Sequence, residues 1–141
     1  MDRPPLLLRT LVGGVATFLA AWWLIGDQSS KGINRPLDYV VRAPDIPNAM
    51  VVAAGVVGLV VAIAILFQLV VAARRGDLRV RHENTAVLAS LAVGFVAAGS
   101  ARVITAGSVG ANIGAGLAVF GGGAIILWLV GVAFRESRKI P

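Results

Sequence analysis

Few residues of this chain have side chains suited to chemistry, and most of them lie outside its long apolar segments. The single histidine, His82, stands beside Glu83 in a charged stretch, where we expect a solvated pair rather than a catalytic one. The sequence has no cysteine, which excludes thiolate nucleophiles, disulfides and iron–sulfur clusters. No acidic or histidine cluster has the spacing of a metal site. We therefore predict a protein that is not an enzyme and that binds neither a metal nor a cofactor.

Arg102 is the one charged residue that falls within an apolar segment. If that segment enters the membrane at Thr85, Arg102 lies about 26 Å along the helix axis, just short of the opposite headgroups. Its long side chain would then reach the headgroups as an anchor. The alternative is a fixed positive charge that faces a cavity and binds an anion or a lipid phosphate. Gln68 and Asn112 are the other candidates for a ligand or lipid contact, although Asn112 also suits the cap of a helix.

The segments that must position these residues are strongly apolar. Hydrophobic residues make up 57% of the 141 residues and charged residues only 14%, against about a quarter in ordinary soluble domains. A helix needs about 20 residues to cross a membrane, and the apolar runs lack the alternation of barrel strands. We therefore predict an all-α integral membrane protein with a single domain over residues 1–141. It forms an antiparallel bundle of four transmembrane helices, at about 6–26, 49–73, 85–105 and 111–134.

The basic residues predict the orientation of this bundle. Nine of the 13 Lys and Arg residues fall in the N-terminal segment, in the loop from Arg74 to Asn84, or in the C-terminal tail. Cytoplasmic loops carry the excess of basic residues, so we expect both termini to be cytoplasmic. The net charge of +6 then points to anionic lipid headgroups as partners. Nucleic acid is not expected, because no basic patch is interleaved with aromatic residues.

Composition also bears on the source and on the two ends of the first loop. Arginine, alanine, glycine and valine, all specified by GC-rich codons, dominate their classes, which indicates a bacterium and hence an inner (plasma) membrane. The first apolar segment ends in Trp22-Trp23-Leu24-Ile25 without a small-residue cleavage site, so we expect it to remain as a helix. For the loop 26–48, with its apolar Tyr39, Val40 and Val41, two interpretations stay open: it lies on the membrane surface, or it is a plain solvated loop.

Small residues at four-residue spacing form the strongest pattern. Residues four apart lie on one helix face, where a second backbone can approach closely. The same spacing recurs in the second and third segments, at Gly58 and Gly94. Three consecutive glycines at 121–123 fit a close helix crossing, a kink or a bound cofactor, and we favour the crossing. The clearest ridge of small residues is in the fourth segment: Gly110, Gly114, Ala118 and Gly122.

These features predict a small multi-pass membrane protein that acts as an accessory or structural subunit. It would pack through its small-residue helix faces against a larger membrane complex, or against another copy of itself as a homo-oligomer. The alternative is a small transporter or a lipid- or anion-binding protein with a pocket near Arg102.

Overall fold

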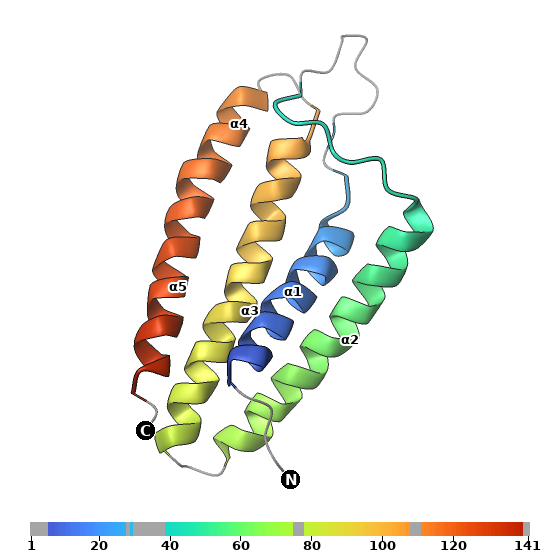
Figure 1. Ribbon diagram of the computed structural model, residues 1–141. Coiled ribbons are helices and arrows are strands. Elements are labelled where there is room, and N and C mark those ends of the chain that lie inside the picture. The colour runs from blue at the N-terminus through green and yellow to red at the C-terminus, as the bar shows by residue number, and fades with distance from the viewer. Residues whose placement is uncertain (1–5, 28, 30–38, 75–77, 108–110, 140–141) are drawn as a thin grey trace.

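The computed structural model describes residues 6–27, 29, 39–74, 78–107 and 111–139, and it contains four helices long and apolar enough to cross a membrane (Figure 1). No strand occurs in these ranges, so the all-helical prediction is confirmed. The fourth helix has three consecutive parts, α4, a π-helical turn η1, and α5. The elements are α1 (Leu6–Ile25), α2 (Asn48–Ala73), α3 (Leu78–Thr105), α4 (Ala111–Leu117), η1 (Ala118–Gly122) and α5 (Gly123–Ser137).

The ends of the helices follow from local chemistry. α1 ends before Gly26, whose φ of 67° is the left-handed conformation that commonly terminates helices. α2 begins after Pro47, whose carbonyl accepts a hydrogen bond from the Met50 N–H at 2.9 Å. Proline suits this place, because the first N–H groups of a helix need no partner within it.

The start of α3 differs from the sequence prediction. The helix begins at Leu78, well before the expected entry near Thr85, so much of the expected loop from Arg74 to Asn84 is helical. The charged residues here hid the helix from a reading based on hydropathy. No glycine or proline follows Gly76 in this stretch, so nothing in it breaks a helix.

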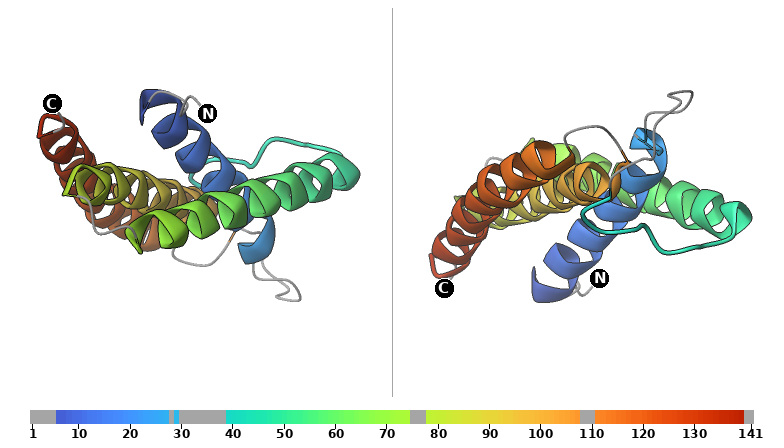
Figure 2. Two further views of the ribbon diagram at one scale, coloured as in Figure 1. Left: turned by 90° about the horizontal axis from the view of Figure 1, so that it is seen from below. Right: turned by 90° about the horizontal axis from the view of Figure 1, so that it is seen from above.

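α3 occupies the centre of the arrangement. It packs against α1 on one side and against the fourth helix on the other, and α1 also packs against α2. α2 and α5 lie at opposite ends of this row and make no contact within the described residues (Figure 2). α1 and α3 run in the same direction, because Ser90 bonds to Thr10 near their starts and Arg102 bonds to Trp22 near their ends. The apolar core between α2 and α3 consists of Ile65, Leu69, Val87 and Leu91, with Leu6 and Val61 packed against it.

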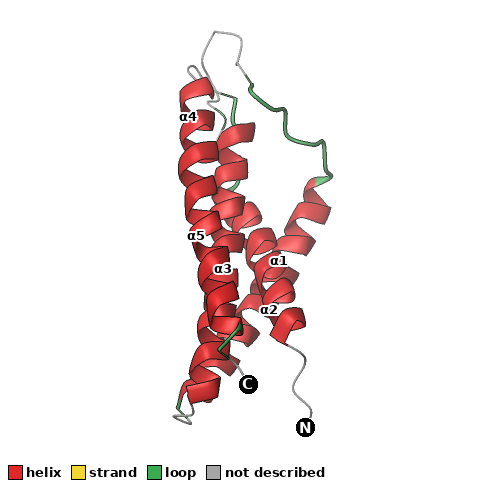
Figure 3. Ribbon diagram, turned by 60° about the vertical axis from the view of Figure 1, so that its left-hand side comes forward, coloured by secondary structure: helices red, strands yellow, loops and turns green. Residues whose placement is uncertain are grey.

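Much of the apolar surface remains uncovered. The fourth helix lies along α3 alone (Figure 3), and α5 has no buried residue. Phe120 is 80% exposed and Trp128 is 67% exposed. Soluble monomers rarely expose apolar patches larger than a few hundred Å².

Candidate functional site

Arg102 joins the end of α3 to the end of α1. Its Nε and Nη2 donate hydrogen bonds of 2.8 Å and 2.5 Å to the carbonyl oxygen of Trp22. The same guanidinium lies 3.9 Å from the centroid of the Trp22 ring. The last four carbonyls of a helix lack partners within it, and a positive charge is favourable at that end. Arg102 therefore acts as a cap for α1 that is supplied by a neighbouring helix.

Polar groups from three segments surround this junction. Asp27 follows α1 and interacts electrostatically with Arg102. Its carboxylate accepts hydrogen bonds from the N–H and the hydroxyl of Ser29, at 3.0 Å and 2.7 Å. The Ser29 hydroxyl oxygen in turn accepts a 3.0 Å hydrogen bond from the N–H of Gly107, just after α3. The Tyr39 ring lies against Gly107, where any side chain would collide with it.

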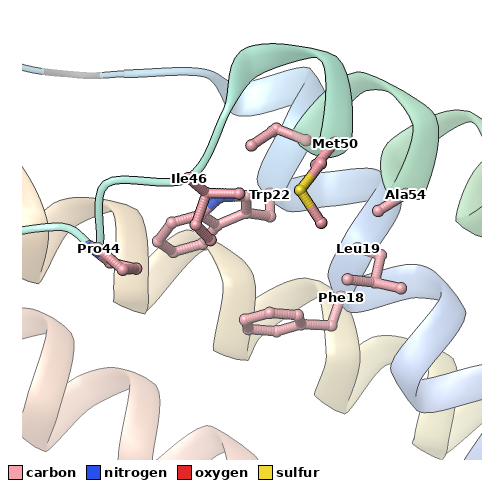
Figure 4. A pocket seen from close by; sticks show the side chains of 8 residues that line it. Phe18, Leu19, Trp22, Pro44, Ile46, Met50 and Ala54 are labelled. Atoms are coloured by element: carbon pink, nitrogen blue, oxygen red, sulfur yellow. The ribbon is translucent and has the colours of Figure 1, made fainter.

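An apolar crevice opens beside the same tryptophan, between α1, the start of α2 and the segment that precedes α2 (Figure 4). Its volume is about 350 Å³. Phe18 and Trp22 stack with ring centroids 5.9 Å apart and form part of its wall. All side chains around it are apolar: Phe18, Leu19, Trp22, Pro44, Ile46, Met50, Val51 and Ala54.

The predicted small residues of the second and third helices lie where two backbones meet. A Cβ placed on Gly94 would collide with the carbonyl oxygen of Gly14 and come within 3.0 Å of the Phe18 nitrogen, both on α1. A Cβ on Gly58 would lie 2.5 Å from the carbonyl oxygen of Ala16. These glycines therefore permit α1 to approach α2 and α3 closely, as small residues do in membrane helices.

The ridge of the fourth helix faces α3 in part. A Cβ on Gly114 would contact Val103 at 3.4 Å, and one on Gly122 would overlap the hydroxyl of Ser100. Ala118 is partly buried between these positions, at the start of the π-helical turn, and Gly110 lies outside the described residues. The ridge is thus used within the chain rather than on its outer surface.

The two polar candidates apart from Arg102 lie elsewhere. Gln68 is exposed on α2 and Asn112 is exposed in the first turn of α4. Neither belongs to the junction of Arg102 with Trp22. The buried polar side chain of the described core is instead Asn84, whose amide donates a 3.1 Å hydrogen bond to the Leu69 carbonyl and links α3 to α2.

The opposite end of the molecule carries an ionic cluster. His82 Nδ1 lies 2.5 Å from Glu136 Oε2, and Lys139 Nζ donates to Glu136 Oε1 at 2.6 Å. His82 thus belongs to a helix and pairs with Glu136 of α5, and the expectation of a loop pair with Glu83 was wrong. Glu83 itself lies 3.9 Å from Arg9 of α1. The cluster contains no group of three possible metal ligands, nor does any other part of the described chain.

Comparison with protein-family models, with curated proteins and with solved structures finds no match for this chain. Its function must therefore be inferred from its own residues. Sequence reasoning singled out Arg102 but missed its partner, because a backbone carbonyl leaves no mark in the sequence. The crevice was also missed, although the aromatic pair four residues apart, Phe18 and Trp22, was a usable signal.

Proposed function

We propose that the chain is a four-span protein of a bacterial inner membrane, with antiparallel helices and both termini in the cytoplasm. Four candidate spans and the uncovered apolar surface support insertion into a bilayer. The excess of basic residues in the segments at the termini supports the orientation.

We further propose that it serves as an accessory or structural subunit, which another membrane helix contacts along the outer face of α5. This face contains Gly121, Ala124, Trp128 and Gly131, all exposed. A Cβ on either glycine would have no atom within 4 Å, so a backbone could approach there closely.

Trp128 is the observation that favours a protein neighbour over lipid at this face. It lies about 14 Å along the helix axis from Ser137, inside the span and below the headgroup level where membrane tryptophans usually lie. The indole N–H is a donor that hydrocarbon cannot satisfy, and Trp128 makes no hydrogen bond within the described residues. A helix packed on this face would supply an acceptor and cover the ring.

A photo-reactive amino acid in place of Ala124 tests this role in intact membranes. The matched control carries it in place of Ile63, which is 56% exposed on α2, on the far side of the molecule. We expect a discrete protein adduct from position 124 and only lipid adducts from position 63. Lipid adducts alone from both positions would contradict a subunit role.

A further inference from the structure

The crevice beside Trp22 has a use beyond the accessory role. Its wall contains no charged or polar side chain apart from the indole, so it cannot hold an ion or a polar solute. Its volume of about 350 Å³ falls within the 300–1,000 Å³ range of ligand sites. α1 and α2 diverge toward this end (Figure 1), and the segment before α2 crosses the opening (Figure 4). An α-helix about 10 Å wide would not enter it, whereas a flexible hydrocarbon chain would.

Positive charge lies directly beside this apolar space. The Trp22 ring forms part of the wall and also lies under the Arg102 guanidinium. Arg42 is exposed and lies two residues before Pro44, a distance of at most about 7 Å along the backbone. Two of the five N–H groups of Arg102 are used on the Trp22 carbonyl, and a guanidinium suits a phosphate geometrically.

We propose that the crevice holds one acyl chain of a membrane phospholipid, whose phosphate lies beside Arg102 and Arg42. The bilayer supplies this ligand, because the crevice lies between the ends of two membrane-spanning helices. Asp27 and Asp45 bring negative charge to the same end of the molecule. Burial of the chain therefore supplies most of the affinity, and the arginines fix the orientation of the headgroup.

Quenching of Trp22 fluorescence by a phospholipid with brominated acyl chains tests the proposal in detergent solution. Trp23→Phe and Trp128→Phe leave Trp22 as the only tryptophan. In this background we expect saturable quenching at one lipid per chain. Ala54→Phe fills the crevice and should raise the half-saturating lipid concentration at least tenfold. The matched control is Ala53→Phe, on the neighbouring exposed position of α2, and it should behave as the parent.

Two further variants make the result decisive if Ala54→Phe folds poorly. Met50→Glu places a charge in the crevice from a side chain that is 63% exposed, and it should abolish saturable quenching. Arg42→Gln removes one phosphate contact and should weaken binding on the order of tenfold. Equal quenching curves for Met50→Glu and the parent, or for Arg42→Gln and the parent, would overturn the proposal.

Discussion

Arg102 holds Trp22 twice, since its guanidinium stacks 3.9 Å from the centroid of the indole ring and bonds to the carbonyl of the same residue. The two residues lie 80 positions apart in the chain. The contact fixes the end of α1 against the end of α3, next to the mouth of the apolar crevice. An arginine at this place therefore has a structural task even when no ligand is bound.

Substitution of Arg102 should loosen this junction. We expect Arg102→Ala to lower the free energy of unfolding in detergent by about 1–3 kcal/mol, because it removes a charged donor from a helix end. Arg102→Lys should fall between alanine and the parent, because lysine lacks the planar fork and the flat stacking surface. Thermal unfolding followed by circular dichroism measures both. A lysine variant as stable as the parent would show that a positive headgroup anchor suffices there.

Gly94 marks the closest approach of α1 and α3, so even one added carbon should be costly there. Gly94→Ala should destabilise the fold, because its Cβ meets the backbone of Gly14 and a backbone cannot rotate away. Gly116→Ala is the matched control, since its Cβ would meet nothing within 4 Å. Equal unfolding temperatures for the two variants would contradict the packing shown here.

The adjacent glycines of the fourth helix should respond in opposite ways. Gly122→Leu should displace the helix from α3, because Gly122 is buried against Ser100. Gly121→Leu should leave the fold intact, because that position faces open space. Replacement of Leu127, which is 75% exposed, should likewise have little effect on unfolding. Tolerance of leucine at position 122 would show that the ridge is not a contact face.

Glu136 should hold the last turns of α5 against the start of α3. Glu136→Gln removes the charge that His82 and Lys139 share, so we expect faster hydrogen exchange of the amides near residue 134. Arg135→Gln, one residue earlier and exposed, is the control and should leave exchange unchanged. Identical exchange in both variants would mean that the ionic cluster adds nothing to this end.

The orientation can be tested with reporter fusions. A reporter active only in the cytoplasm should work when fused at Pro141, and one active only in the periplasm should work within the loop 26–48. This follows from the distribution of basic residues. Periplasmic activity at Pro141 would reverse the predicted topology.

The sequence predicted the helices better than it predicted their partners. Length and apolarity locate four spans, because each requirement can be read from one continuous segment. The early start of α3 was missed because charged residues such as Arg81 conceal a helix from hydropathy. The partner of Arg102 could not be predicted, since the Trp22 carbonyl is free only because α1 ends nearby and because α3 runs beside it. Exposure of Gln68 likewise depends on the outward side of α2, which no local pattern reveals.

The π-helical turn at Ala118–Gly122 has a consequence for the phase of the fourth helix. A π turn accommodates one residue more than a regular α-helical turn, so the two halves of this helix are offset by one position. Each α-helical residue corresponds to about 100° of rotation. Deletion of Gly121 would restore a continuous α-helix and turn everything after it by that angle, which would carry Glu136 away from His82. A single-residue insertion or deletion here is therefore a rotary change, and it decides which side chains of α5 meet α3 and which are presented to a neighbour.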